Sequence, residues 1–169
     1  MARSETWSKL KYFSPDSKID SWGNPDLISD NLLWRLDDFR KWLGVPVYVT
    51  SGVRSSSENS YHHPSRGACA VDIVVPDYMD TPFDLVMDST RFGFTGIGYY
   101  PHWQWKGLVV GGLHLDTRPL KPDSDDTLNY TQSRWMGVLN EDRKQVYVEM
   151  NFQNMVDYAI NKSDAVGIH

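Results

Sequence analysis

Residues 69–75 read C-A-V-D-I-V-V, so a single carboxylate, that of Asp72, stands in the middle of an apolar run. A short run rich in β-branched residues predicts a strand that is buried on both faces. Burying a carboxylate in such a strand costs on the order of several kcal/mol unless it is paired with a charge or bound to a metal. The alternative is that Asp72 lies on a solvated face, but Ala70 and Val74 on the same face are apolar. Asp72 therefore predicts a buried polar site.

A second polar stretch, G-L-H-L-D-T-R over residues 112–118, carries an imidazole and a carboxylate two positions apart. Alternate residues of a strand share a face, so His114, Asp116 and Arg118 are expected to point the same way. On an exposed strand such a pattern is common and has no special meaning. It gains meaning only if the fold brings it beside Asp72.

A third stretch, just before the Asp72 strand, contains two adjacent imidazoles, His62 and His63, in a loop rich in Ser, Asn and Pro. Histidines in such a loop are more often surface residues than metal ligands. Two histidines and one carboxylate, with a coordination position left for water, nevertheless form the ligand set of a hydrolytic zinc site. The joint occurrence predicts Zn²⁺ bound by one of the paired histidines, by Asp72 and by His114.

Composition limits the classes of protein to which the chain can belong. Its 169 residues are enough for one domain with a real core, and 40% of them are hydrophobic. The net charge of -5 and the lack of a Lys or Arg run argue against a nucleic-acid partner. No apolar run is long enough to span a membrane, and the start M-A-R-S-E-T-W predicts no secretory signal peptide. The single Cys69 excludes an internal disulfide.

The order of predicted elements indicates the fold class. Apolar residues at Ile28, Leu32, Leu36, Phe39 and Leu43 predict a helix that begins at Asn24-Pro25 and ends at Gly44. The other predicted elements are strands at 45–50 and 69–75, a loop at 51–67, a helix at 81–90, an antiparallel pair at 96–100 and 112–117, a loop at 121–132, an edge strand at 134–139 and a final helix capped by Asn140. This order predicts an α+β fold, with helices packed on a small, mostly antiparallel sheet.

Several motifs, taken together and in order, resemble the zinc D-alanyl-D-alanine carboxypeptidase family. They are V-Y-V-T-S-G-V-R-S (47–55), N-S-Y-H (59–62), G-A-C-A-V-D-I (67–73), G-I-G-Y-Y-P (96–101) and L-H-L-D-T-R (113–118). That family includes phage L-alanyl-D-glutamate endolysins and shares its fold with the hedgehog signalling domain. The resemblance is nearest to its phage-encoded branch and covers residues 13–119. It implies an N-terminal arm (1–23), a zinc peptidase-like core (24–119) with the hedgehog-like fold, and a C-terminal extension (120–169) packed on the same domain.

The resemblance also implies which residues are ligands. Asp72 and His114 match the family pattern directly. For the remaining ligand, the N-S-x-H lead-in favours His62, whereas a shorter insertion before Asp72 favours His63. We prefer His62 and keep His63 as the alternative, because adjacent residues face opposite ways and only one should bind the metal.

Two further residues have catalytic roles by the same resemblance. Arg54 matches the arginine of the family's S-G-x-R-S motif, which holds a substrate carboxylate or stabilises the oxyanion; the alternative is a structural ion pair. The family's general base, an acid three positions before the last ligand, is replaced here by Gly111. Asp116 is the best local substitute as a base, or else it orients His114 through a hydrogen bond to the ring nitrogen that does not bind the metal.

Residues around these ligands are candidates for contact with substrate. If residues 101–111 fold over the site, its aromatic rings would flank the metal, although core packing is the commoner use of such rings. The candidates for substrate binding are Ser60, Tyr99, Tyr100, Trp103 and Arg118.

The resulting prediction is a zinc-dependent peptidase that cleaves the peptide stems of peptidoglycan, either as a D,D-carboxypeptidase or as an L-Ala-D-Glu type endopeptidase. The resemblance implies a phage-encoded enzyme that stays in the host cytoplasm until a holin-type release, or one carried in the virion with other virion proteins as partners. The alternative is a zinc-containing phage structural or wall-binding module that hydrolyses nothing.

Overall fold

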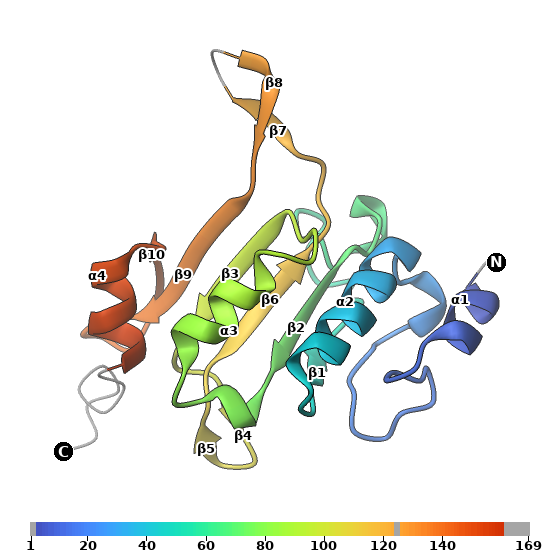
Figure 1. Cartoon of the computed structure of the whole chain (residues 1–169), viewed down its shortest axis with the longest axis horizontal. Helices are drawn as coiled ribbons and strands as arrows, with labels where there is room; N and C mark the ends of the chain where they lie inside the picture. The colour runs from blue at the N-terminus through green and yellow to red at the C-terminus, as the bar shows by residue number, and fades with distance from the viewer. Residues whose placement is uncertain (1–2, 124–125, 161–169) are drawn as a thin grey trace.

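A six-stranded sheet forms the centre of the computed structural model, which describes residues 3–123 and 126–160 (Figure 1). The strands lie in the order β1 (Tyr48–Ser51), β2 (Ala70–Val74), β6 (Gly112–Asp116), β3 (Gly96–Tyr100), β9 (Ser133–Leu139) and β10 (Gln145–Glu149). Neighbouring strands are antiparallel except β3 and β9, which are parallel. The α+β prediction is confirmed, with a sheet that is mixed.

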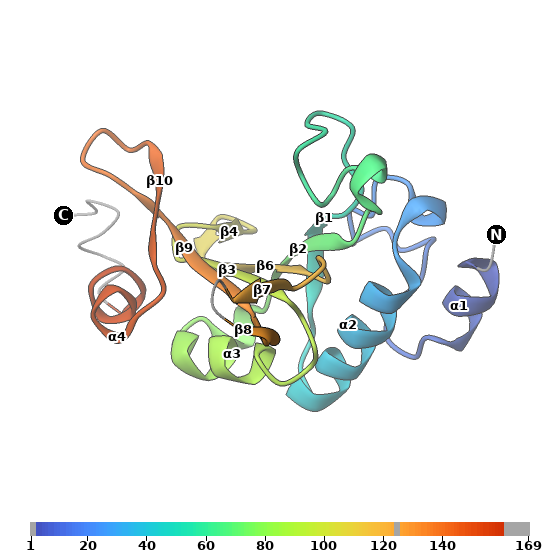
Figure 2. The same ribbon diagram turned by 90° about the horizontal axis from the view of Figure 1, so that it is seen from above.

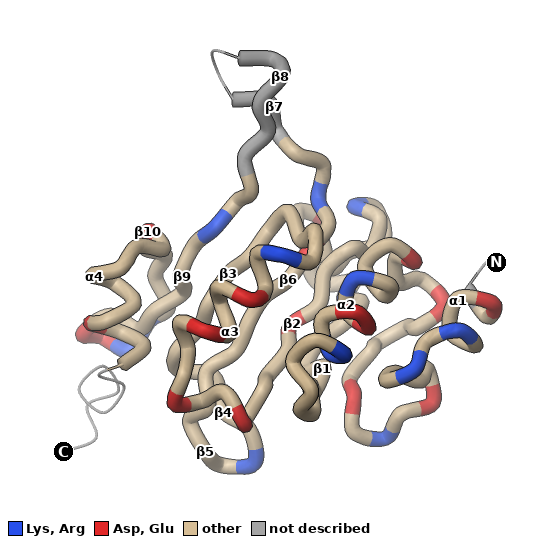
Figure 3. The backbone as a smooth tube through the Cα atoms, viewed as in Figure 1, with Lys and Arg blue, Asp and Glu red and all other residues tan. Residues whose placement is uncertain are grey.

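Helices α2 (Asp30–Leu43) and α3 (Pro82–Ser89) cover one face of this sheet, as the view from above shows (Figure 2). The predicted start of α2 was wrong. Asn24 caps a separate 3-10 turn, η1 (Pro25–Leu27), and Ser29 is the N-cap of α2. Gly44 ends the helix in the left-handed conformation, as predicted. Acidic and basic residues both occur along α2 (Figure 3).

The N-terminal arm packs against the body through its aromatic residues. It begins with α1 (Arg3–Lys9) and continues without regular structure. Trp7, Phe13 and Trp22 are each buried, and both other rings meet Trp22 edge-on, at centroid distances of 5.0 Å and 5.6 Å. The arm is thus part of the hydrophobic core and not a loose extension.

The chain after residue 119 differs most from the predicted elements. The predicted loop at 121–132 is a hairpin of β7 (Lys121–Asp123) and β8 (Asp126–Thr131) that projects from the body (Figure 1). The strand predicted at 134–139 exists as β9 but is interior, because β10 pairs with its outer edge. Asn140 begins no helix. The final helical segment is α4 (Phe152–Asn154) followed by η4 (Met155–Ile160), and its cap is Asn151.

Alternation along the central strands separates the core from the polar face. Val71 and Ile73 of β2 and Leu113 and Leu115 of β6 belong to the hydrophobic core that α2 and α3 complete. The alternate residues of the same strands therefore point to the opposite face of the sheet, and these include Asp72, His114 and Asp116. The polar residues of β2 and β6 are thus collected on the face away from the two helices.

Three short segments connect these elements around the polar face. The 3-10 turns η2 (Pro64–Arg66) and η3 (Pro76–Tyr78) flank β2, and the hairpin of β4 (Gln104–Trp105) and β5 (Leu108–Val109) joins β3 to β6. Across residues 3–123 and 126–160, the helices all fall short of the length and hydropathy needed to cross a membrane.

Candidate metal centre

Two of the predicted ligands are placed by strand pairing. Asp72 of β2 and His114 of β6 are direct cross-strand partners in the antiparallel register. Such partners have neighbouring Cβ atoms, so both side chains project side by side from the polar face. Two distant stretches of sequence therefore meet because β6 is inserted between β2 and β3.

The third ligand comes from the loop before β2. His62 is completely buried, and the backbone on both sides of it is hydrogen-bonded. The Arg54 amide donates to the His62 carbonyl at 3.1 Å, and the Cys69 amide donates to the Tyr61 carbonyl at 2.9 Å. The loop is therefore held against the sheet and carries the His62 ring over Asp72.

The three side chains converge on one point. His114 Nδ1 lies 2.9 Å from Asp72 Oδ1, His62 Nε2 lies 3.2 Å from the same oxygen, and the two ring nitrogens lie 3.2 Å apart. All three residues are buried, and together they form a group that could hold a metal ion. Donor atoms of a tetrahedral site with bonds of about 2.0–2.2 Å are about 3.3–3.6 Å apart, which is near these spacings.

The outer partners of the two rings fix their tautomers. His62 Nδ1 lies 2.6 Å from the Gly52 carbonyl oxygen, which can only accept, so Nδ1 carries a hydrogen. His114 Nε2 lies 2.9 Å from Asp116 Oδ2, so this nitrogen donates to the carboxylate. In neutral rings the inner nitrogens then present lone pairs to each other and to Asp72. Facing lone pairs repel, and a cation or a shared proton between them removes that repulsion.

The pKa values follow from this crowding. Burial favours the neutral form of Asp72, but hydrogen bonds from His114 and His62 outweigh it and hold the pKa of Asp72 well below its usual range. Burial also favours the neutral form of His114, yet its bonds to Asp116 and Asp72 raise the pKa of His114 above the ordinary value. The carboxylates therefore stay charged and attract a positive charge to the centre.

Asp116 supports His114 from behind. Its carboxylate is fully buried and accepts from His114 Nε2, from the Arg118 amide at 3.0 Å and from the Arg118 guanidinium. Burial opposes its charge, but these partners prevail and lower the pKa of Asp116 to about 2. Asp116 contacts the ring nitrogen that faces away from Asp72. Of the two roles predicted for Asp116, this geometry favours orientation of His114 over proton transfer at the metal.

His63 lies outside the group. Its ring is half-buried and caps η2, where Nδ1 accepts from the Ser65 amide at 3.1 Å. The backbone turn between His62 and His63 sends the two rings in different directions, as expected for adjacent residues. The structure thus places His62, and not His63, with Asp72 and His114.

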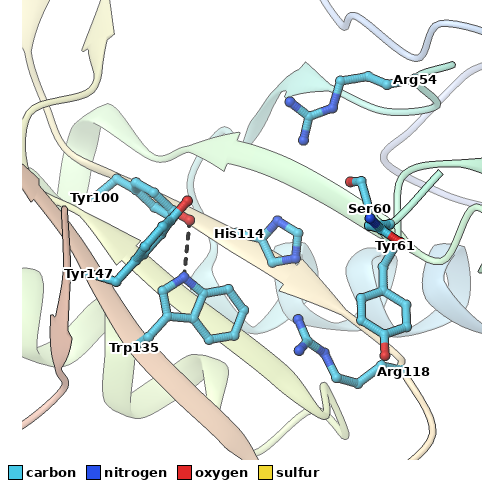
Figure 4. A pocket seen from close by; sticks show the side chains of 9 residues that line it. Arg54, Ser60, Tyr61, Tyr100, His114, Arg118, Trp135 and Tyr147 are labelled. Atoms are coloured by element: carbon cyan, nitrogen blue, oxygen red, sulfur yellow. Dashed lines mark hydrogen bonds between the residues drawn. The ribbon is translucent and has the colours of Figure 1, made fainter. Parts of the chain in front are cut away.

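A cleft of about 450 Å³ opens above His114 (Figure 4). Its lining residues are Arg54, Asn59, Ser60, Tyr61, Tyr100, His114, Arg118, Trp135 and Tyr147. The Arg54 guanidinium lies 3.3 Å from Asp72 Oδ2, and its side chain is 44% exposed. Arg54 therefore neutralises part of the Asp72 charge, and the rest of its guanidinium surface remains exposed to the cleft.

The other predicted contact residues divide into two groups. Ser60, Tyr100 and Arg118 line the cleft. Tyr99 does not: it is 1% exposed and belongs to the hydrophobic core, because it points to the helical face of β3. Tyr99 and Tyr100 were both predicted to contact substrate, and for Tyr99 this was wrong, because only Tyr100 lines the cleft. Trp103 is not among the lining residues either, and it stacks on Tyr100 with ring centroids 4.2 Å apart.

Gly111, which stands where the resembled family has its acid, has a φ of 71°. A side chain in this left-handed conformation is strained, and a Cβ there would also collide with the Tyr99 hydroxyl. The position is therefore built for glycine. Among the described lining residues of the cleft, none is an acid.

Sequence reasoning missed the part of the cleft that comes from the C-terminal extension. Trp135 of β9 and Tyr147 of β10 line the cleft opposite Ser60 and Tyr61 (Figure 4). A signal did exist in the glycines at alternate positions of β3, because Gly98 leaves the space that the Trp135 ring fills. Which aromatic ring fills it depends on the parallel β3–β9 pairing, and that pairing has no signature in the sequence.

Comparison of the chain with family models, with curated proteins and with solved structures gave no match. The resemblance set out above therefore remains a prediction, and the site is interpreted from its own geometry.

Proposed function

We propose that the protein is a zinc-dependent peptidase. The observation that carries this proposal is the convergence of two imidazole lone pairs and one carboxylate oxygen beside an open cleft that His114 lines. Two histidines and a carboxylate are a known ligand set of catalytic zinc, which keeps an open coordination position. The hedgehog-like fold implied by the resemblance belongs to the same proposal.

Each residue of the centre has a defined task in this proposal. His62, Asp72 and His114 would hold the ion, and Asp116 would keep His114 in the required tautomer. When bound, zinc lowers the pKa of a water molecule and polarises a carbonyl group. Arg54 would bind a substrate carboxylate or the developing oxyanion, since a guanidinium is a permanently charged, forked donor.

The substrate class comes from the resemblance rather than from the geometry. On that basis the substrate is the peptide stem of peptidoglycan, and the bond cut is of the D,D-carboxypeptidase or the L-Ala-D-Glu endopeptidase kind. A phage origin, with release through a holin or carriage in the virion beside other virion proteins, is part of the same inference. An exposed arginine beside the metal ligands agrees with a substrate that carries carboxylates.

A second candidate function is a zinc-containing wall-binding or virion module without catalysis. Gly111 favours it, because that position cannot carry the usual acid without strain. The only carboxylate at the centre besides the ligand Asp72 is Asp116, as far as the described residues show, and it is engaged by His114 and Arg118. Under this alternative the same centre stabilises the fold around a ligand-binding cleft.

One experiment separates these functions. Purified protein is analysed for zinc by elemental analysis and added to suspensions of cell walls of several chemotypes, and the turbidity is followed. About one zinc per chain with loss of turbidity supports the peptidase. Zinc without lysis of any wall supports the binding module. Asp72→Ala should lose both zinc and lysis, and full zinc occupancy in this variant would contradict the ligand set.

A further inference from the structure

One wall of the cleft is aromatic and is built largely by the C-terminal extension. Tyr100 of β3, Trp135 of β9 and Tyr147 of β10 line this side, and we call these three residues the aromatic wall (Figure 4). Arg54 and Ser60 line other parts of the cleft, with His114 between them and the wall (Figure 4). A ligand that fills the cleft thus meets polar groups at one end and ring faces at the other.

Trp135 is held rigidly next to the metal centre. Its backbone pairs with Gly98, which in turn pairs with His114, so the three residues lie in one row across the sheet. The indole lies over Gly98, where a Cβ would be 2.5 Å from the Trp135 ring. Its ring centroid is 5.4 Å from that of His114, and the Arg118 guanidinium lies 5.0 Å from the centroid. Such a ring is a fixed platform beside a metal ligand.

Hydroxyl groups are attached to this platform. The Trp135 indole N–H donates to the Tyr100 hydroxyl at 3.0 Å, and the Tyr147 hydroxyl is a hydrogen-bonding neighbour of the Tyr100 hydroxyl. Burial raises the pKa of Tyr100 to about 12, so the group remains a neutral hydroxyl. The Tyr147 hydroxyl accepts from Gln145 Nε2 at 3.2 Å. The wall therefore combines the exposed ring of Tyr147 with neighbouring hydroxyl groups, while the Tyr100 ring is buried and stacks on Trp103.

Tyr147 is the member of the wall with most of its surface free. It is 65% exposed although it is a large aromatic residue that lines a cleft. Its cross-strand partner is Gly137, whose lack of a side chain makes room for the Tyr100 ring. The ring face of Tyr147 is thus available to a ligand and needs no rearrangement of the sheet.

We propose that the aromatic wall is a sugar-binding subsite, so that the preferred substrate is a peptide still joined to its glycan. A pyranose ring offers an apolar C–H face for stacking and a hydroxyl edge for hydrogen bonds, which is the combination that the wall presents. An apolar peptide side chain would use the ring faces alone. This inference rests on the proposed peptidase function, with the peptide carboxylates towards Arg54 and the sugar on the wall.

The test compares two substrates of the zinc-loaded protein: a stem peptide alone, and the same peptide attached to an N-acetylated muramyl sugar. The kcat/KM for the sugar-bearing substrate should be higher by about three- to tenfold, as expected for stacking on one or two rings. Tyr147→Ala should remove most of this advantage, and Tyr147→Phe should keep the larger part of it. Val146→Ala on the same strand, which does not line the cleft, is the matched control and should preserve the ratio. Thermal unfolding of each variant checks its fold.

A binding measurement makes the subsite testable without hydrolysis. A soluble trimer of N-acetylglucosamine is titrated into the zinc-loaded protein, and the indole N–H signals are followed by NMR. A shift of one indole signal that Tyr147→Ala weakens supports the subsite, even if neither substrate is cleaved and the peptidase function fails. No binding of the trimer, with equal kcat/KM for the two substrates, overturns the subsite while the peptidase function stands.

Discussion

His114 is held between two carboxylates, with Nε2 2.9 Å from Asp116 Oδ2 and Nδ1 2.9 Å from Asp72 Oδ1. Asp116 is two residues further along the same strand, and Asp72 is the cross-strand partner of His114. A single strand thus supplies both a proposed ligand and the group that orients it, while the neighbouring strand supplies the proposed carboxylate ligand. This arrangement follows from the alternation of side chains along β6 and from the register in which β2 and β6 pair.

The role of Asp116 can be tested by Asp116→Asn. The amide has no charge, and it cannot hold both the His114 N–H and the Arg118 guanidinium as the carboxylate does. Because Asp116 contacts the outer nitrogen of His114, zinc affinity should fall about 10- to 100-fold, and excess zinc should restore the bound state and any wall-lytic activity. A zinc titration of both proteins measures this effect. Unchanged affinity with turnover lowered by two to four powers of ten would instead identify Asp116 as the general base.

The paired histidines should behave differently although they are adjacent. His62→Ala removes a buried ligand and should abolish stoichiometric zinc binding. His63→Ala removes only the cap of η2, so it should keep zinc and lower the free energy of unfolding by about 1 kcal/mol. Elemental analysis and urea unfolding of the two variants give the comparison. Loss of zinc from His63→Ala alone would mean that the loop is placed differently.

Gly98 should be sensitive to the smallest added side chain. A Cβ at this position would lie 2.5 Å from the Trp135 ring, so Gly98→Ala should lower the free energy of unfolding by about 1–3 kcal/mol. Trp135→Phe removes the part of the ring that collides. In the double variant the two effects should therefore be less than additive, and urea unfolding of the four proteins measures the coupling. Strict additivity would show that Trp135 does not lie over Gly98.

Local features of the sequence singled out Asp72 and His114 as candidate ligands, and the structure brings both together with His62 in a group that could hold a metal ion. Asp72 interrupts an apolar strand, and His114 shares a strand face with Asp116. The choice of His62 over His63 depends on a loop whose hydrogen bonds to Gly52 and Arg54 are not visible in the sequence.

The C-terminal half of the cleft could not be predicted in the same way. The β3–β9 pairing is parallel and joins strands more than thirty residues apart, so no hairpin motif in the sequence indicates it. Residues 145–149 read Q-V-Y-V-E, an alternation typical of a strand, but Val148 also fits a helical spacing with Phe152, Met155 and Ala159, which is why β10 was predicted as part of a helix. Tyr99 was predicted to contact substrate together with its neighbour Tyr100, but strand alternation places only Tyr100 at the cleft.

The pH dependence of stability should change sign when zinc is added. In the metal-free protein the pKa of His114 is raised by Asp116 and Asp72, although burial opposes this. A raised folded pKa contributes stability that is present below the unfolded value of about 6.5 and is lost as pH rises through the folded pKa. Without metal, the free energy of unfolding should therefore fall over that range, as the inner lone pairs of His62 and His114 come to face each other unscreened.

With zinc in excess the trend should reverse, because the metal binds only the deprotonated ring and no longer competes with a proton at higher pH. Urea unfolding between pH 6 and 9, with a chelator or with zinc, measures both curves. At the acid end both forms should lose stability as pH falls from about 4 towards about 2. The folded pKa of Asp116 is lowered to about 2, so its charged carboxylate stabilises the fold at higher pH, and this stabilisation is lost as the group is protonated. Parallel curves with and without zinc would contradict a zinc ion bound by His62 and His114, because an ion at that point has to displace the proton from the inner ring nitrogens.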